Sequence, residues 1–136
     1  MKFADTGWWV AWALPADPRH EPALAMRTKL GQNEQIITTN LVVGETWTFL
    51  RRRDSHRTAI GFLDRVHRLA EASRLVVHRV TEPQETSAWD WLRRHEERVY
   101  SFVDATSFRV MRDRRLQEAL AFDSGFAAAG FVEVQP

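Results

Sequence analysis

The amino-acid sequence predicts an α/β fold, a three-layer α/β/α sandwich around a central, mainly parallel sheet. Short apolar strands such as Leu75–Val77 alternate along the chain with longer amphipathic helices such as His56–Ala72. This alternation is typical of a parallel sheet with helices on both faces. The 136 residues suit a single domain over residues 1–136, because no linker, repeat or low-complexity segment divides them.

The predicted strands are short, apolar and bounded by turn residues. In chain order they are Lys2–Ala4, Ile36–Ile37, Leu75–Val77, Ala119–Phe122 and Phe131–Val134. The last of them alternates apolar and polar residues, a pattern that favours an edge strand.

The predicted helices combine apolar residues at helical spacing with capping residues, Pro or Gly at their ends. In chain order they are Trp8–Leu14, a helix from His20 toward Gly31, a helix capped within Thr38–Asn40 and closed by Arg51–Arg53, His56–Ala72, Ser87–Arg98, a helix capped by Ser101, and Phe126–Ala129.

Four acidic residues stand where this fold would bring them together. Asp5 and Asp123 follow predicted strands, Asp104 is the third residue of the helix capped by Ser101, and Glu45 lies among apolar residues of its helix. Sites in parallel sheets form outside the carboxyl ends of the strands, where the strand order reverses. If the strands before Asp5 and Asp123 flank that reversal, all four carboxylates meet in one crevice.

A cluster of four carboxylates requires protons or a cation. Two carboxylates about 4 Å apart repel each other by roughly 4 kcal/mol at an effective dielectric constant of 20. Oxygen ligands without any cysteine suit Mg²⁺ or Mn²⁺. Such ions activate water for attack on phosphodiesters. Thr6, Thr39 and Ser101 are expected to orient the carboxylates or the waters around the ion.

Composition limits the classes of partner and compartment. The net charge is +1, so bulk charge favours neither a nucleic-acid partner nor an acidic one, but lysine occurs only twice and nearly all positive charge is arginine. Arginine binds phosphate and carboxylate in a bidentate manner. Because the chain lacks cysteine, a signal peptide and a long apolar run, we expect a cytoplasmic protein that binds no membrane.

Four short motifs share their order and spacing with a known family. They are Asp5-Thr6, Thr38-Thr39 followed by Glu45, Tyr100–Asp104 with Ser107-Phe108, and Ala121–Asp123 with Phe126 and Gly130-Phe131. Together they resemble the PIN-domain ribonucleases, especially the VapC toxins of type II toxin–antitoxin systems, over almost the whole chain.

The resemblance implies a single PIN domain that cleaves RNA endonucleolytically with Mg²⁺ or Mn²⁺. It implies that the catalytic metal ligands are Asp5, Glu45, Asp104 and Asp123, with Thr6 and Ser101 beside them. It also implies a homodimer and a cognate antitoxin protein whose C-terminal segment lies across the crevice. The chain departs from the common pattern at Gly7-Trp8, and Arg98-Val99 lack an acid that many relatives carry.

Other interpretations remain open at this point. The chain could be a catalytically silent PIN-like module that binds a basic partner peptide or RNA without cleavage. An aspartyl-phosphate transferase with Asp5 as the nucleophile is disfavoured, because Gly7 stands where a second acid is expected. The six tryptophans could stack on bases or form a dimer face, but aromatic residues at helical spacing more often belong to the core; Trp8 and Trp12 are the candidates for an interface.

Overall fold

A computed structural model describes all residues, 1–136, and contains five strands and seven helices. The strands are β1 (Lys2–Ala4), β2 (Ile36–Thr39), β3 (Leu75–His78), β4 (Glu118–Leu120) and β5 (Val132–Glu133). The helices are α1 (Thr6–Ala13), α2 (His20–Thr28), α3 (Asn40–Arg53), α4 (His56–Glu71), α5 (Glu82–Arg94), α6 (Phe102–Asp113) and α7 (Gly125–Ala128). None of these helices combines the length and apolarity that a membrane span requires.

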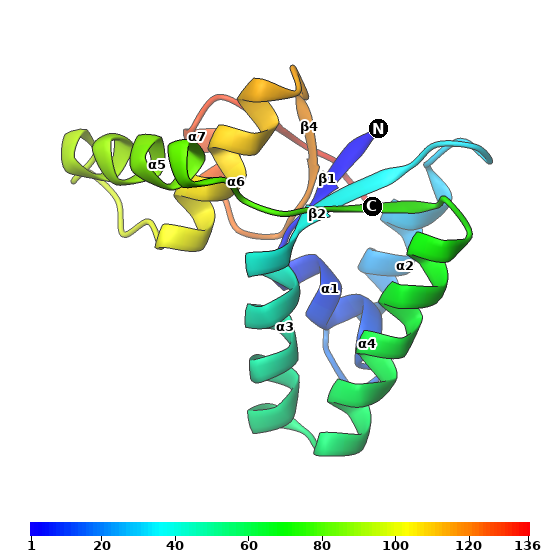
Figure 1. Cartoon of the computed structure of the whole chain (residues 1–136). Coiled ribbons are helices and arrows are strands. Elements are labelled where there is room, and N and C mark those ends of the chain that lie inside the picture. The colour runs from blue at the N-terminus through cyan, green and yellow to red at the C-terminus, as the bar shows by residue number, and fades with distance from the viewer.

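The five strands form one parallel sheet in the order β3-β2-β1-β4-β5. The chain runs outward from β1 to β2 and β3 and then returns to the other side of β1 as β4. The strand order therefore reverses between β1 and β4, as the sequence analysis required. In Figure 1, α1 to α4 lie together below the sheet, and α5, α6 and α7 gather at its upper left. The predicted α/β/α sandwich is confirmed.

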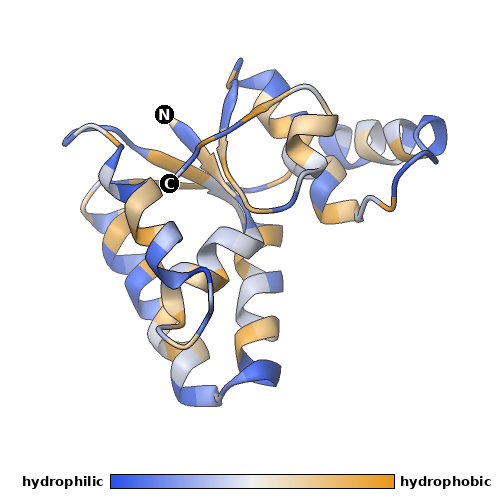
Figure 2. Cartoon of the chain, turned by 180° about the vertical axis from the view of Figure 1, so that it is seen from behind, coloured by the Kyte–Doolittle hydropathy of each residue, from blue (hydrophilic) through white to orange (hydrophobic).

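Two clusters of aromatic rings fill the space between sheet and helices. Trp8, Trp9, Trp12 and Phe62 pack against one another within the group formed by α1 to α4. On the other side, Phe108 contacts the rings of Trp91, Tyr100, Phe126 and Phe131. Figure 2 shows the matching pattern of hydropathy, with apolar strands inside and a hydrophilic end of α3 outside. Burial of these rings supplies much of the hydrophobic stabilisation of the fold.

The expectation that Trp8 belongs to an interface is wrong. Its side chain is 0% exposed, and its indole N–H donates to the carbonyl oxygen of Ala23 at 3.3 Å. Trp12 is partly buried, stacks on Trp8, and is covered by the guanidinium group of Arg65 at 3.6 Å from the ring centroid. Helix α1 is apolar on every side because sheet and helices surround it, so its tryptophans belong to the core.

Several element boundaries differ from the predicted ones. Helix α5 begins at Glu82, five residues before the predicted Ser87, because Thr81 and Gln84 form a capping box ahead of it. It ends at Arg94 rather than Arg98. Helix α1 begins at Thr6 rather than Trp8, and β4 ends at Leu120 rather than Phe122. Element ends are set by capping and pairing partners, which apolar spacing alone does not locate.

The contacts of Phe108 predict a large stability cost for its removal. Phe108 is fully buried and touches four aromatic rings, so Phe108→Ala should lower the free energy of unfolding by about 3–5 kcal/mol. Phe49 is 45% exposed, and Phe49→Ala should cost less than about 1 kcal/mol. Urea unfolding followed by circular dichroism measures both values, and equal costs would contradict this account of the core.

Candidate active site

A cavity of about 500 Å³ opens at the carboxyl ends of β1 and β4 and collects all four acids named from the sequence. Its lining consists of Asp5, Thr6, Gly7, Arg19, Glu45, Phe49, Val99, Tyr100, Ser101, Asp104 and Asp123. The carboxylates come from four different segments of the chain, which meet where the strand order reverses. This location is the one that parallel α/β sheets use for ligand binding.

Strand pairing places Asp5 and Asp123 at this point. Ala4 of β1 lies opposite Leu120 of β4, and the backbone N–H of Asp5 donates to the Leu120 carbonyl oxygen at 3.1 Å. Asp123 follows three residues later on a turn, where its Oδ1 accepts from the backbone N–H of Gly125 at 2.8 Å. A Cβ at Gly125 would lie 3.2 Å from that oxygen, so glycine leaves room for the carboxylate.

Asp104 is fixed by the capping box predicted from the sequence. The hydroxyl oxygen of Ser101 accepts from the Asp104 backbone N–H at 2.9 Å, and Asp104 Oδ2 accepts from the Ser101 backbone N–H at 2.9 Å. The carboxylate also lies at the positive end of α6. Burial nevertheless raises the pKa of Asp104, and the nearby charge of Asp123 raises it further.

Glu45 reaches the cavity from the middle of α3. The hydroxyl of Thr6 donates to Glu45 Oε1 at 2.6 Å and so joins the start of α1 to this side chain. Thr39 does not line the cavity. It is fully buried, and its Oγ1 accepts from the backbone N–H of Val42 at 3.1 Å as the N-cap of α3. Thr6 and Ser101 therefore lie beside the acids, as expected, whereas Thr39 is buried at the start of α3 and does not line the cavity.

The electrostatic cost of the arrangement concentrates on Asp5. This side chain is only 6% exposed, and burial raises its pKa from 3.8 to about 7. A hydrogen bond from the Thr6 backbone partly opposes this rise, whereas the negative charges of Asp104, Glu45 and Asp123 add to it. Asp5 is therefore a buried acid among other acids, and a bound cation would relieve both the desolvation and the repulsion.

The donor set fits a hard divalent cation, because all four side chains offer carboxylate oxygens. As the side chains lie in this structure, no three acids or histidines form a group that could hold a metal ion. Three of the carboxylates instead accept hydrogen bonds, Glu45 from Thr6, Asp104 from the Ser101 backbone and Asp123 from the Gly125 backbone. To bind an ion, these side chains would have to rotate slightly within the cavity, or the same oxygens would have to accept the hydrogen bonds and coordinate the ion as well.

The structure adds basic and aromatic residues that sequence reasoning did not assign to the site. Arg19, in the loop between α1 and α2, lines the cavity with its guanidinium group 5.4 Å from the centroid of the Phe122 ring. Arg98 lies 3.8 Å from Asp123 Oδ1 and donates to the hydroxyl oxygen of Ser124 at 2.8 Å. Both arginines lie in loops, where no periodic pattern predicts the direction of a side chain.

Comparison with protein families and curated proteins gives consistent matches. The family model described as the PIN domain matches residues 2–132. The chain is 48% identical over 136 residues to the 23S rRNA-specific endonuclease VapC20 of Mycobacterium tuberculosis, an alignment that covers 100% of this chain and 99% of that protein.

Comparison with solved structures extends the same result. The crystal structure of M. tuberculosis VapC20, described as a sarcin-ricin loop cleaving toxin, superposes with a TM-score of 0.91 at 44% identity and covers 100% of both chains. FitAcB from Neisseria gonorrhoeae superposes with a TM-score of 0.71 at 17% identity, over 100% of this chain and 98% of that one. VapBC2 from Rickettsia felis gives 0.68 at 13% identity, over 97% and 96%.

The last two likenesses concern the fold alone, because so few residues are identical. The match to VapC20 extends beyond the fold, because both sequence and structure agree over almost the full length of both chains. The chain therefore belongs to the PIN-domain family and, within it, to the VapC ribonucleases of toxin–antitoxin systems.

Proposed function

We propose that the protein is a divalent-metal-dependent endoribonuclease whose catalytic metal ligands are Asp5, Glu45, Asp104 and Asp123. Nucleases of the PIN family generally depend on a divalent metal ion. The observation that carries the assignment is the single cavity at the switch point between β1 and β4, to which all four carboxylates contribute. Mg²⁺ is the ion that we propose, with Mn²⁺ as a substitute, because both favour oxygen ligands.

The protein side chains prepare this cavity for phosphodiester hydrolysis. The chemistry that a divalent ion supplies in such a site is activation of water and stabilisation of the leaving oxygen. Asp5 and Asp104, the less exposed acids, and Glu45 and Asp123, the exposed ones, are the residues that would hold such an ion. Thr6 orients Glu45 through its 2.6 Å hydrogen bond. The capping box keeps the Asp104 carboxylate at the cavity through the backbone of Ser101.

We propose ribosomal RNA as the substrate, on the basis of 48% identity to a 23S rRNA-specific endonuclease over the whole chain. The structural relative is described as cleaving the sarcin-ricin loop. Arg19 and Arg98 lie at the edge of the acidic cavity, where their guanidinium groups can bind phosphates next to the scissile bond.

We further propose that the protein is a single PIN domain over residues 1–136, acts as a homodimer and is inhibited by a cognate antitoxin. The antitoxin assignment is supported by membership of the VapC group. A basic side chain of the antitoxin would be stabilised by the same four carboxylates that we assign to the metal.

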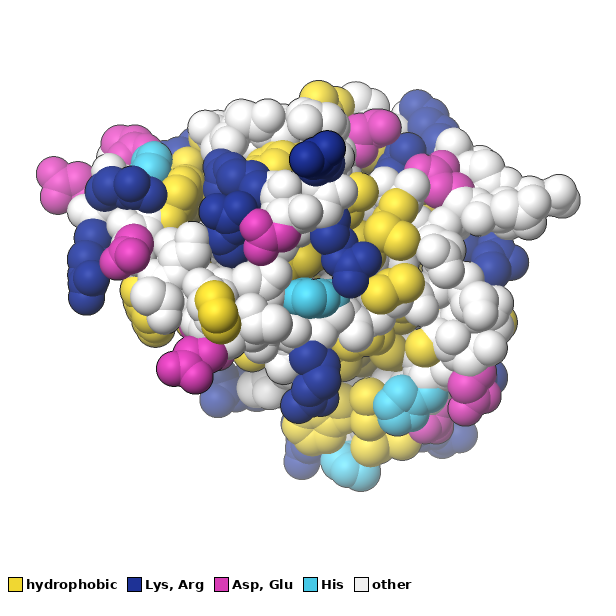
Figure 3. Space-filling model, turned by 45° about the horizontal axis from the view of Figure 1, so that its top comes forward, with side chains coloured by type: hydrophobic (Ala, Val, Ile, Leu, Met, Phe, Trp, Pro, Cys, Tyr) yellow, Lys and Arg dark blue, Asp and Glu magenta, His cyan; other side chains and the backbone are white.

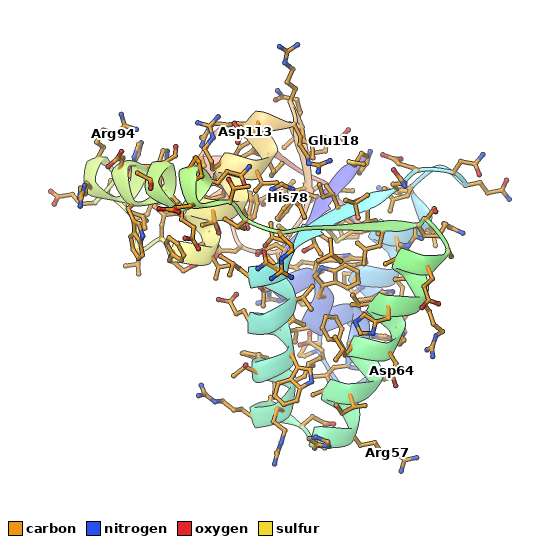
Figure 4. The ribbon with its side chains drawn as sticks, in the orientation of Figure 1. Arg57, Asp64, His78, Arg94, Asp113 and Glu118 are labelled. Atoms are coloured by element: carbon orange, nitrogen blue, oxygen red, sulfur yellow. The ribbon has the colours of Figure 1, made fainter.

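Neutral substitutions of Asp5 and Asp104 should abolish cleavage and leave the fold intact. Asp5→Asn and Asp104→Asn each remove a ligand charge, so we expect cleavage of 23S rRNA with Mg²⁺ to fall more than about 100-fold, beyond the loss seen for residues that only support a ligand. Asp64→Asn is the matched control, because Asp64 is exposed on α4 (Figure 4).

Gel analysis of the RNA, with and without a chelator, measures this effect. Full cleavage by both variants would overturn the assignment of the acids. Metal-independent cleavage by the unmodified chain would overturn the metal assignment. RNA binding without any cleavage by the unmodified chain would instead favour a catalytically silent binding module.

The raised pKa of Asp5 predicts a pH dependence of stability in the absence of divalent metal. Between pH 3.8 and about 7 the folded chain binds a proton at Asp5 that the unfolded chain releases. The stabilisation from this proton is therefore complete below pH 3.8 and is lost as the pH rises through 7. At pH 8 the loss amounts to on the order of 4 kcal/mol at most, since each tenfold change in proton affinity corresponds to about 1.4 kcal/mol.

Thermal unfolding in a chelator tests this dependence. The melting temperature of the unmodified chain should fall from pH 5 to pH 8 by more than that of Asp5→Asn. Added Mg²⁺ at pH 8 should raise it in the unmodified chain and change it little in the variant. Parallel pH curves for the two chains would contradict the raised pKa.

A further inference from the structure

A second cavity, of about 560 Å³, lies between α5 and α6 and has the opposite charge. Three arginines, a histidine and a serine line it together with one tryptophan: Ser87, Trp91, Arg94, His95, Arg109 and Arg112. It shares no lining residue with the acidic cavity, and no acidic side chain lines it. In Figure 3, Lys and Arg side chains gather over this part of the molecule.

The positive charge of this cavity is only partly compensated. Arg109 pairs with Asp113, one turn later on α6. Neither Arg94 nor Arg112 forms an ion pair. Arg112 is held by uncharged partners, because its Nη2 donates to the carbonyl oxygen of Ala129 at 3.2 Å and its guanidinium lies 5.1 Å from the Phe131 ring centroid. Of the three arginines that line the cavity, only Arg109 therefore has a carboxylate partner.

The histidine of the cavity is fixed in orientation. His95 stacks on Trp91 with ring centroids 4.0 Å apart and an angle of 12° between the planes. Its Nδ1 lies 2.7 Å from the carbonyl oxygen of Trp91, and since a carbonyl only accepts, Nδ1 carries the hydrogen. The other ring nitrogen, Nε2, has no protein partner among the hydrogen bonds of His95 and can donate to an anion when the ring is protonated.

We propose that this cavity, named here the α5–α6 basic cavity, binds phosphate groups of the RNA at a distance from the cleavage site. The proposal rests on the proposed function, because it assumes an RNA substrate. A polyanion that approaches four carboxylates is repelled by them, so phosphate contacts farther from the acidic cavity strengthen its binding. Planar guanidinium groups without paired acids supply such contacts.

The position of the cavity suits one RNA strand that also occupies the active site. Helix α6 carries Ser101 and Asp104 at its start and Arg109 and Arg112 in its last turns. At a rise of about 1.5 Å per residue, Arg109 lies roughly 7 Å and Arg112 roughly 12 Å along the helix from Asp104. Each residue also turns the helix by about 100°, so Arg109 and Arg112 project from other sides of α6 than Asp104, and an RNA strand that occupies both sites would pass around this helix. In Figure 4, Arg94 of α5 points to the same upper side on which Asp113 ends α6.

Salt-dependent RNA binding by an inactive chain tests the proposal. In an Asp104→Asn background, which prevents cleavage of the probe, the added pair Arg94→Gln and Arg109→Gln should weaken binding to 23S rRNA about 10-fold or more. The slope of log affinity against log salt should decrease by about 0.7–0.9 for each phosphate contact removed. The matched control pair is Arg57→Gln and Arg68→Gln, which should change neither value. Both arginines are exposed on α4, which does not line the cavity, and Figure 4 shows Arg57 far from α5 and α6.

Two further variants guard against an effect of misfolding. Arg94 makes no ion pair and is exposed, so Arg94→Gln alone keeps the fold and should show the loss of a single contact. Arg94→Lys retains the charge and should retain the salt slope, although it loses bidentate binding. Melting temperatures close to that of the parent chain confirm that each protein is folded.

Each outcome decides the proposal. Unchanged affinity and slope for the Arg94 and Arg109 pair would overturn it, as would an equal loss for the control pair, which would indicate a general effect of charge. Unchanged RNA affinity with weakened binding of the cognate antitoxin would also overturn it and make the cavity a protein-docking site. A selective loss of RNA affinity supports the cavity even if the unmodified chain cleaves no RNA, a result that would count against the proposed function alone.

Discussion

The parallel pairing of β1 with β4 is the constraint on which the site depends. Five strands could be arranged in many orders, but only this neighbour relation brings residue 5 beside a segment that the chain reaches more than a hundred residues later. The hydrogen bond from the Asp5 N–H to the Leu120 carbonyl oxygen lies at the carboxyl end of that pairing. Beyond it, the two segments of the chain are no longer paired, and the acidic cavity opens at this point.

The scaffold around the cavity opposes the repulsion among its acids. Asp104 is tied to the backbone of Ser101, Glu45 to the hydroxyl of Thr6, and Asp123 to the backbone of Gly125. The bonds of Asp104 and Asp123 are local to a helix start and a turn, whereas the bond of Glu45 joins α3 to α1, and all three form without a bound ligand. The aromatic cluster around Phe108 packs next to the same region. Phe108 contacts Tyr100, which lines the cavity, and Phe126, which follows Asp123 closely in the chain.

Patterns that depend on neighbouring residues were read correctly from the sequence. The capping box of Ser101 and Asp104 involves residues three apart, and the confirmed strands are short apolar runs between turns. The convergence of four acids was a hypothesis about strand order, and the observed order supports it. Family resemblance strengthened that hypothesis, because spacing alone left other strand orders open.

The remaining features depend on contacts that no local pattern encodes. Trp8 is a candidate interface residue by sequence alone, yet its side chain is fully buried within its own chain. Thr39 was expected at the acids, but its hydroxyl serves the start of α3 instead. Arg19 reaches the cavity from a loop whose path is set by tertiary packing.

The brevity of β5 has a consequence for the behaviour of the molecule in concentrated solution. This strand has two residues and ends one side of the sheet. A long, flat border would present a row of unpaired amide and carbonyl groups as a template for a further chain. Two residues offer too few such groups for amyloid-like stacking to begin at this border, so self-association through β5 is disfavoured.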